Sequence, residues 1–412
     1  MTLTRRMALA TASALLSTTA LPALAQENIV KIGVLAPMSG AAAADGNEMV
    51  NGTQLAVDEL NAVGGVAGYK FEVVVGDVGE ASADSVATAT RRLLSDRDMG
   101  AIMTGYASGS NFEIELMAEQ DMIYLLSGNS AQTEGIIAEE PDYFKTVWSF
   151  TPSYEAYETG VLPVIEGLES DGALDLPNRK IAIISSDHPY SKTVAEGLTE
   201  SFEGGGWEIT ENELLPFGEI NNWRGFLAQV RQNPPGVVVN TDYLPGNAAA
   251  FISQFMEDPT DSLVFIQYAP SVPEFLELTK DDSTGVVYNL LAGPINSPKN
   301  PRAKEVIDKY VAAFGKEPGS YGVSLYEQMM MYSDALEAVG DPADREAIGE
   351  WIGNADKQTA MGRMRFDPQT HLAVQGNDGV PLQFYQIWEG ERILFSPEQY
   401  ATGKFQTPPW MK

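Results

Sequence analysis

Short apolar runs alternate with longer amphipathic segments along most of the chain. Two early runs, Ile29–Leu35 and Phe71–Val75, are rich in β-branched residues and end before glycine or proline, which is typical of buried strands. Between them apolar residues recur at helical spacing until Gly64 and Gly65 interrupt the pattern. This spacing predicts a helix, and the three segments together predict a strand–helix–strand unit.

The same alternation continues in two series. In the first, further strands are expected at 101–104 and 123–126, and helices at 82–95 and around 113–119. In the second, which begins near residue 180, strands are expected at 181–184, 207–209, 237–239 and 263–266, and helices at 191–202, 223–232 and 248–256. Helices are then expected at 303–314, 325–339 and 343–351, and strands at 382–388 and 392–394. Strands and helices that alternate at this spacing favour parallel sheets covered on both faces, so the expected fold class is α/β with two doubly wound parallel-sheet lobes.

Parallel sheets of this kind bind ligands at the carboxyl ends of their strands, where loops and helix N-termini present backbone N–H groups. The candidate site therefore lies in the loops that follow the strands ending near residues 35, 104, 126, 184, 239 and 266.

Residues 1–25 are typical of an export signal. Arg5 and Arg6 precede an uncharged stretch rich in alanine and leucine, and Ala23-Leu24-Ala25 supplies the small residues that a signal peptidase accepts. The pattern predicts cleavage before Gln26 and an exported protein, most simply in a bacterial periplasm. Thr4-Arg5-Arg6 also resembles part of a twin-arginine signal, so Sec and twin-arginine export both stay open. Because the chain has no cysteine, no lipid anchor is expected.

The composition excludes several classes of function. Asp and Glu number 57 against 26 Lys and Arg, which gives a net charge of −31. Such a surface repels phosphate backbones, so nucleic acid is excluded as a partner. The absence of cysteine excludes disulfides, thiolate nucleophiles and Cys-type metal sites, and the only histidines are His188 and His371. No metal and no cofactor is expected.

Catalytic motifs are scarce. There is no Walker loop, no G-x-G-x-x-G after a strand and no zinc-protease motif. The segment Gly105–Gly109 is similar to a nucleophile elbow, but its serine stands one position too late. His188 follows a strand and could serve a catalytic triad, although a polar loop residue at the edge of a cleft explains it better. A secreted α/β hydrolase is therefore the alternative from another class, and an enzyme is not expected.

Several motifs occur in the order found in a known family. They are Ile32–Gly40, Asn51-Gly52, Asn61–Gly68, Gly105–Ser110, Leu126–Ser130, Ser186–Tyr190, Val238–Pro245 and Gly362–Asp367. Together, behind an export signal, they resemble the Leu/Ile/Val-type periplasmic substrate-binding proteins of ABC transporters over essentially the whole mature chain. The resemblance implies a monomer that binds an amino acid, or a related small amide or amine, and delivers it to a permease in the inner membrane. A periplasmic sensor subunit that reports the same kind of ligand is an alternative.

The family's fold implies two lobes joined by three hinge crossings, which close on the ligand. Lobe one would comprise residues 26–150 and 293–365, and lobe two residues 151–292 and 366–412. The crossings would lie near 149–152, 290–295 and 366.

The resemblance also assigns ligand contacts. In lobe one they fall on small residues of two strand-end loops, Ser108, Gly109, Ser110, Gly128 and Ser130. In the family such residues hold the carboxylate and part of the ammonium group of an amino acid. In lobe two, Tyr190 and Tyr243 match the aromatic positions of the family.

Three positions depart from the family's pattern. Asp45 stands where leucine binders have an aromatic residue, Gln267–Pro270 stands where they have a glutamate for the ammonium group, and Gly109 occupies the slot of a serine. These departures argue against a plain branched-chain amino acid as the ligand. We hypothesise that Asp45 supplies the missing charge, unless it is only a solvated loop acid, beside aromatic walls formed by Tyr106, Tyr190, Tyr243 and Tyr268. Such a pocket would suit a cationic or amide-bearing ligand, including a methylated amine.

Overall fold

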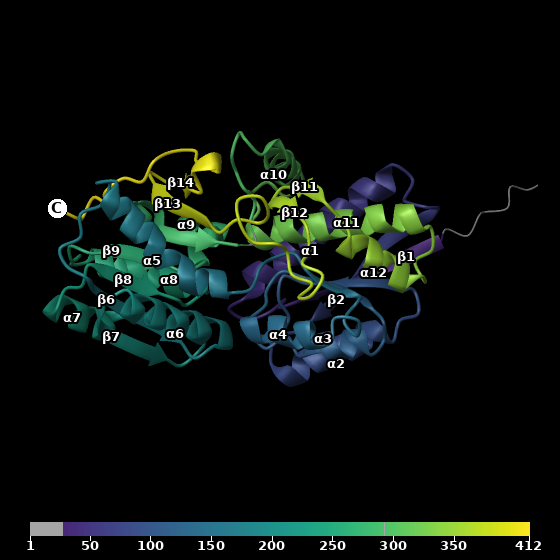
Figure 1. Cartoon of the computed structure of the whole chain (residues 1–412), viewed down its shortest axis with the longest axis horizontal. Helices are drawn as coiled ribbons and strands as arrows, with labels where there is room; N and C mark the ends of the chain where they lie inside the picture. Colours follow the sequence, from purple (N-terminus) through teal and green to yellow (C-terminus); the bar gives the residue numbers. More distant parts are fainter. Residues whose placement is uncertain (1–27, 292) are drawn as a thin grey trace, which may run out of the picture.

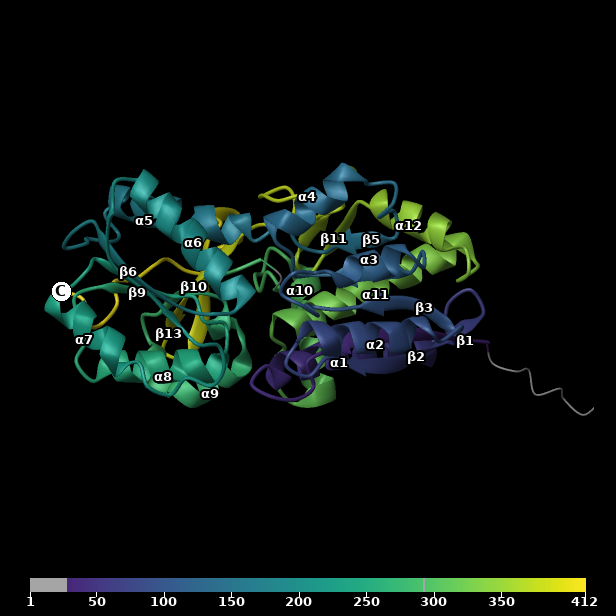
Figure 2. The ribbon, with the colours of Figure 1, turned by 90° about the horizontal axis from the view of Figure 1, so that it is seen from below.

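The computed structural model describes residues 28–291 and 293–412, which form two α/β lobes side by side (Figures 1 and 2). The expected export signal at 1–25 lies outside the described residues. Within the described ranges, no helix has both the length and the apolar character that a membrane span requires.

Lobe one is built on a five-stranded parallel sheet of order β2-β1-β3-β4-β5. Its strands are β1 (Asn28–Ala36), β2 (Tyr69–Asp77), β3 (Met99–Met103), β4 (Ile123–Leu126) and β5 (Val147–Ser149). The helices on one face are α1 (Ala43–Ala62), α10 (Pro301–Phe314), α11 (Ser320–Val339) and α12 (Arg345–Gly353). Those on the other face are α2 (Ala83–Leu94), α3 (Glu113–Ala118) and α4 (Ala131–Glu139). The lobe is therefore doubly wound, as predicted.

Lobe two is built on a seven-stranded sheet of order β14-β13-β10-β9-β8-β6-β7. Its strands are β6 (Lys180–Ser186), β7 (Glu208–Leu215), β8 (Val237–Asn240), β9 (Leu263–Ile266), β10 (Val287–Leu290), β13 (Gln383–Trp388) and β14 (Glu391–Ser396). The first five are parallel, and β13 and β14 join antiparallel at one edge. One face packs against α5 (Glu155–Ser170) and α6 (Pro189–Gly204). The other packs against α7 (Arg224–Gln232), α8 (Pro245–Met256) and α9 (Pro273–Thr279). Short 3₁₀ turns are Ala269–Ser271, Lys280–Ser283 and Glu398–Tyr400.

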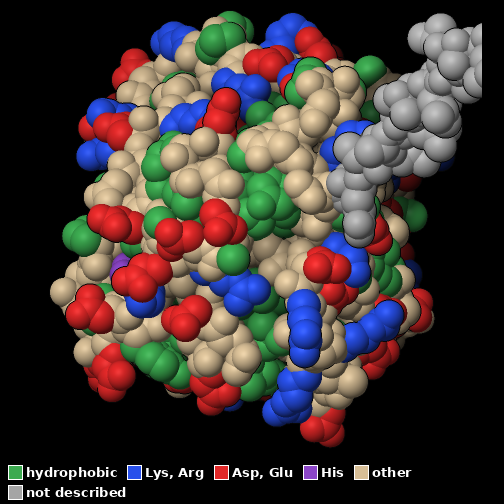
Figure 3. Space-filling view, turned by 90° about the vertical axis from the view of Figure 1, so that its right-hand side faces the viewer, with side chains coloured by type: hydrophobic (Ala, Val, Ile, Leu, Met, Phe, Trp, Pro, Cys, Tyr) green, Lys and Arg blue, Asp and Glu red, His purple; other side chains and the backbone are tan. Residues whose placement is uncertain are grey.

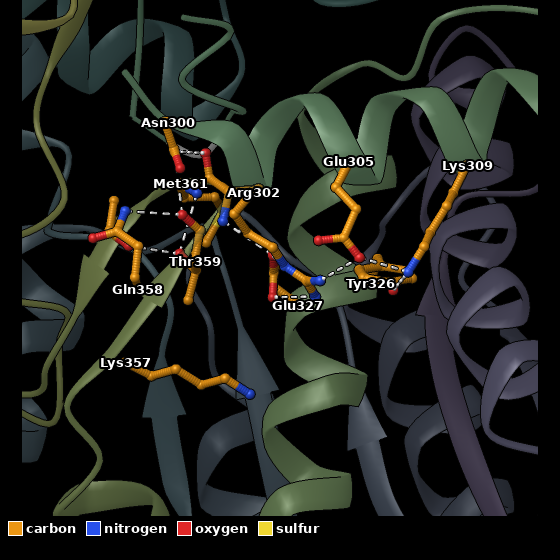
Figure 4. A network of polar contacts seen from close by, with 12 residues as sticks. Asn300, Arg302, Glu305, Lys309, Tyr326, Glu327, Lys357, Gln358, Thr359 and Met361 are labelled. Carbon is orange, nitrogen blue, oxygen red and sulfur yellow. Dashed lines mark hydrogen bonds and ion pairs between the residues drawn. The ribbon is translucent and has the colours of Figure 1, made fainter. Parts of the chain in front are cut away.

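The helices of lobe one are tied to a small hairpin, β11 (Lys357–Thr359) and β12 (Gly362–Met364), by a polar network (Figure 4). Arg302 of α10 donates from Nε to Glu327 Oε1 of α11 at 2.9 Å, and the same oxygen accepts the amide of Ala360 at 3.0 Å. Asn300 donates to the Thr359 and Ala360 carbonyls. This network fixes the hairpin against the helices before the chain returns to lobe two.

Chain segments pass between the lobes after β5, after β10 and after the β11–β12 hairpin. The third passage lies further along the chain than the boundary expected near residue 366. Phe366 and Val380 pack in the core of lobe one, and Ser149 of β5 pairs with Leu372. The ring of Phe366 lies against Phe150, with centroids 5.5 Å apart. Residues 366–380 therefore belong with lobe one, and the passage follows Val380.

The Asn51-Gly52 motif allows two helices of lobe one to approach closely. A Cβ atom on Gly52 of α1 would lie 2.1 Å from the carbonyl oxygen of Gly322 in α11, so only glycine fits. This contact sets the N-terminal ends of α1 and α11, which carry Asp45 and Tyr321, next to the gap between the lobes.

Lysine and arginine side chains are mixed with aspartate and glutamate on the outer end of lobe one (Figure 3). Basic residues are thus present on the surface, although the acidic ones outnumber them in the sequence.

Candidate functional site

A cavity with an empty volume of about 540 Å³ lies between the lobes, at the carboxyl ends of both sheets. Cavities in this position commonly hold small ligands. It is lined by Tyr106, Ser108, Gly109, Ser127, Thr151, Tyr154, Tyr157, His188, Tyr190, Tyr243, Tyr268, Leu291 and Tyr321.

The wall from lobe one consists of the loops after β3, β4 and β5 and the first turn of α11. Asn129 fixes two of these loops, because its amide donates to Ser149 Oγ at 3.0 Å, to Thr151 Oγ1 at 3.3 Å and to the Pro152 carbonyl at 3.2 Å. The Ser127 carbonyl in turn accepts a hydrogen bond from Thr151 Oγ1 at 2.7 Å. The small polar residues of this wall are therefore held rigidly before any ligand arrives.

The wall from lobe two begins with the Asp187-His188-Pro189-Tyr190 motif. His188 is the N-cap of α6 and accepts the Tyr190 amide on Nδ1 at 3.3 Å, while Pro189 occupies the first helical position. Burial lowers the pKa of His188 to about 4, so the ring is neutral at neutral pH. His188 packs against Phe217 and Tyr243. Its structural role is thus to start the helix that carries Tyr190.

Seven of the described residues that line the cavity are tyrosines. Many of the rings meet at steep angles. Tyr190 and Tyr243 have centroids 5.8 Å apart at 86°, Tyr106 and Tyr243 6.1 Å apart at 80°, and Tyr154 and Tyr190 4.9 Å apart at 74°. Such edge-to-face pairs are favourable, and they make a box of rings that contains members from both lobes.

Asp45 connects the two lobes. It is only 4% exposed, and its Oδ2 accepts from Tyr106 at 2.9 Å while Oδ1 accepts from Tyr268 at 3.0 Å. Burial raises the pKa of Asp45 to about 7, and the two tyrosine hydroxyls partly offset that effect. Asp45 is therefore a buried group behind two cavity rings, and the alternative of a solvated loop acid is wrong.

Tyr268 reaches Asp45 from a strained turn. The residue has φ 59° and ψ −54°, and the amide of Ala269 donates to the Gln267 carbonyl at 2.6 Å. This is a γ-turn of the rare form that costs free energy for a non-glycine residue. A strained backbone conformation persists where surrounding contacts hold it in place. Here the turn directs the Tyr268 side chain from lobe two toward Asp45 in lobe one.

A second buried carboxyl group lies behind the wall from lobe one. Ser108 Oγ donates to Glu113 Oε2 at 2.5 Å, and Tyr124 donates to Glu113 Oε1 at 3.2 Å. Burial raises the pKa of Glu113.

None of the described residues that line the cavity is lysine or arginine. No cluster of His, Asp or Glu suited to a metal ion occurs in the described ranges.

Six of the ten site residues predicted from the sequence line the cavity, namely Tyr106, Ser108, Gly109, Tyr190, Tyr243 and Tyr268. Asp45 lies directly behind them. Three others have different surroundings. Ser110 is exposed, the Gly128 carbonyl accepts from Asn111 Nδ2 at 2.8 Å, and Ser130 caps α4 by accepting the Thr133 amide at 3.3 Å.

Sequence reasoning missed Ser127, Thr151, Tyr154, Tyr157, Leu291 and Tyr321, and it gave His188 only a place at the edge of a cleft. Tyr154 and Tyr157 directly follow the first expected crossing, near 149–152. Their position next to a crossing between the lobes could have indicated that they line the cavity. Tyr321 lies in the first turn of α11, ahead of the helix predicted from residue 325.

Comparison with known proteins gives one consistent result. The model of the periplasmic binding protein family matches residues 29–387. Among curated proteins, the chain is 26% identical to Leu/Ile/Val-binding protein homolog 8 of Brucella suis, over 98% of this chain and 99% of the relative. It is 23% identical to Leu/Ile/Val-binding protein homolog 7 of Brucella abortus, over 92% and 94% of the two chains.

Solved structures agree in fold. A Silicibacter pomeroyi protein described as a branched-chain amino acid ABC transporter superposes with a TM-score of 0.82 at 29% identity, covering 93% of this chain and all of the other. The branched-chain amino acid binding protein LivJ of Streptococcus pneumoniae, solved with isoleucine, gives 0.72 at 19% identity, covering 88% and 97% of the two chains. The two-lobed architecture matches these structures.

Proposed function

Because the chain belongs to the periplasmic binding protein family, whose members are binding proteins rather than enzymes, we propose that it is the periplasmic solute-binding component of an ABC importer. Its ligand is an amino acid or a related small amide or amine, held in the cavity between the lobes. The relatives named above as Leu/Ile/Val-binding proteins support this ligand class.

The observation that carries the proposal is the composition of the cavity walls. Both lobes contribute strand-end loops to one cavity, and the contact between Asp45 and Tyr268 joins the lobes beside it. A ligand that touches both walls favours the closed arrangement over an open one by its differential binding free energy. Binding by closure needs such a two-sided cavity and no reacting group.

A thermal-shift screen of residues 26–412 tests the proposal. The protein is unfolded and refolded first to remove any ligand that co-purifies, and then screened against amino acids, amides and ureas, polyamines and methylated amines. At a ligand concentration 100-fold above Kd, linkage predicts about 2.7 kcal/mol of stabilisation. A clear rise in melting temperature with one chemical class is the expected result, whereas no rise with any class would contradict the proposal.

A further inference from the structure

Two buried carboxyl groups lie behind the cavity walls, and no lysine or arginine side chain lies among the described residues of the walls. Asp45 accepts hydrogen bonds from two lining tyrosines, and Glu113 accepts one from the lining residue Ser108 at 2.5 Å. The cavity lining contains no lysine or arginine within the described ranges. A ligand carboxylate would find no cation here, and the Ser108 hydroxyl already donates to Glu113. The site therefore disfavours a carboxylate.

The hydroxyl groups of the walls are also engaged. Ser127 Oγ contacts Ser324 Oγ at 2.5 Å and accepts from Gln328 Nε2 at 2.8 Å, and Thr151 Oγ1 donates to the Ser127 carbonyl. A primary ammonium group brings three N–H donors that need acceptors once they leave water. A fully methylated ammonium group brings none, so it fits these walls without a lost hydrogen bond.

Ring faces are the remaining means of binding a cation. The Tyr157 hydroxyl accepts the Leu291 amide at 2.9 Å, and the Tyr190 hydroxyl accepts from Gln267 Nε2 at 3.1 Å. The hydroxyls of Tyr106 and Tyr268 donate to Asp45, so four of the seven lining tyrosines have a hydrogen-bond partner within the protein at their polar ends. A cation within about 6 Å of several such rings is attracted by each of them, most strongly when it is desolvated.

The approach to the cavity has the same sign of charge. A neighbouring hollow with an empty volume of about 1400 Å³ shares Tyr106 and Tyr243 with the cavity. Its walls include Glu80, Glu219 and Glu274 and, among the described residues, no lysine or arginine. A cleft lined by one sign of charge raises the local concentration of the opposite charge. Cations are thus drawn toward the tyrosine box.

We infer that the ligand is a quaternary ammonium compound, a small organic cation without a carboxylate; this inference rests on the proposed function. The tyrosine rings hold its charge, and Asp45 is the buried counter-charge.

Two ligands that differ only in charge test this inference. Choline and its neutral carbon isostere 3,3-dimethylbutan-1-ol have the same shape, so their affinity ratio isolates the contribution of the cation. Both are titrated calorimetrically into refolded residues 26–412, beside tetramethylammonium, leucine and acetamide. We expect choline to bind at least 100-fold more tightly than its isostere and more tightly than leucine. Because the change is made in the ligand, no variant has to fold.

The Asp45→Asn variant supplies a second readout. Asparagine keeps one acceptor for a tyrosine hydroxyl but removes the charge and the second acceptor. Weaker closure should lower the affinity of both choline and its neutral isostere, and the loss of the charge should lower choline affinity by about a further tenfold or more. Equal binding of choline and its isostere would overturn the inference, as would binding of leucine or acetamide in the absence of cation binding, and either result leaves the proposed function intact. Failure of every compound here and in the wider screen would contradict both.

Discussion

The hydroxyl of Tyr268 in lobe two donates a hydrogen bond to Oδ1 of Asp45 in lobe one at 3.0 Å. The partners come from the γ-turn after β9 and the first turn of α1. The other carboxylate oxygen is bound by Tyr106 at 2.9 Å. One buried acid thus joins the two lobes and supports two rings of the cavity, and disturbing it should affect closure, stability and binding together.

Removal of the Tyr268 hydroxyl should weaken the closed state. Tyr268→Phe keeps the ring but loses the bond to Asp45, and a net hydrogen bond is worth about 0.5–1.5 kcal/mol. We expect roughly three- to tenfold weaker binding of the ligand found in the screen, measured by calorimetry. Tyr326→Phe is the matched control, because its hydroxyl donates to Glu59 within lobe one, away from the cavity. Equal losses in both variants would mean that the interlobe bond has no special role.

Asp45 should make the free energy of unfolding depend on pH. Burial raises its pKa to about 7 in the folded protein, against about 3.9 in an unfolded chain. Between these values the folded protein binds more protons, so the contribution of Asp45 lowers the free energy of unfolding as pH rises from about 4 to about 7. Relative to Asp45→Asn, the free energy of unfolding of the unliganded wild-type protein should fall by roughly 1–3 kcal/mol between pH 5 and pH 8.

Chemical denaturation at several pH values measures this difference. The comparison with the variant is needed because burial also raises the pKa of Glu158 to about 7. Asp58→Asn, an exposed position on the same helix, is the control. Parallel pH profiles for the wild-type protein and Asp45→Asn would contradict the burial of a titrating group at this position.

His188 should be needed as a helix cap and not as a base. His188→Ala removes the acceptor of the Tyr190 amide and should lower the free energy of unfolding by about 0.5–2 kcal/mol. His188→Asn, which restores a side-chain acceptor, should recover most of that stability. Because burial holds the pKa of His188 near 4, titration of this ring should not change ligand affinity between pH 6 and pH 8. A change in affinity in that range that disappears in His188→Asn would contradict the assignment.

The Arg302–Glu327 pair should stabilise lobe one and leave the ligand class unchanged. Glu327 is buried and accepts from Arg302 and from the Ala360 amide. Arg302→Met leaves that carboxylate without its charged partner and should cost about 1–3 kcal/mol of unfolding free energy. Lys304→Met, which removes an exposed pair with Asp308, should cost less than about 1 kcal/mol. Thermal melts of both variants check the contrast, and equal costs would contradict it.

Most of the fold could be predicted because its apolar residues recur with the periods of strands and helices, about 2 and 3.6 residues. The expected strand at 123–126 matches β4, and the helix expected at 303–314 lies within the bounds of α10. The elements that were missed carry weak patterns. Strand β5 has only three residues, and α5 contains Pro163 and Gly160, which weaken a helical pattern. A Cβ on Gly160 would lie 2.3 Å from Cδ2 of Leu382, so this part of α5 packs closely against the chain that enters β13.

Site residues were predictable where a motif places them directly after a strand. Tyr190 in the first turn of α6 and Tyr243 in the loop after β8 both line the cavity, whereas Ser130 follows β4 in the same way and serves as a cap. Whether a loop serine faces the cavity or its own helix depends on local hydrogen bonds that spacing does not reveal. The contact between Asp45 and Tyr268 joins residues far apart in sequence, so no local pattern could predict the pairing.

A cross-link between the lobes tests the central claim, that the ligand is enclosed between them. Ser271 of lobe two and Ser320 of lobe one have hydroxyl oxygens 3.2 Å apart, and the chain has no cysteine of its own. The variant Ser271→Cys/Ser320→Cys is oxidised either before or after the ligand from the screen is added, and ligand exchange is measured with a labelled sample. We expect the reduced protein to exchange ligand freely. Protein that is oxidised before the ligand is added should not bind it, and protein that is oxidised with the ligand bound should not release it. Exchange at the same rate in all three states would contradict a site enclosed by the two lobes.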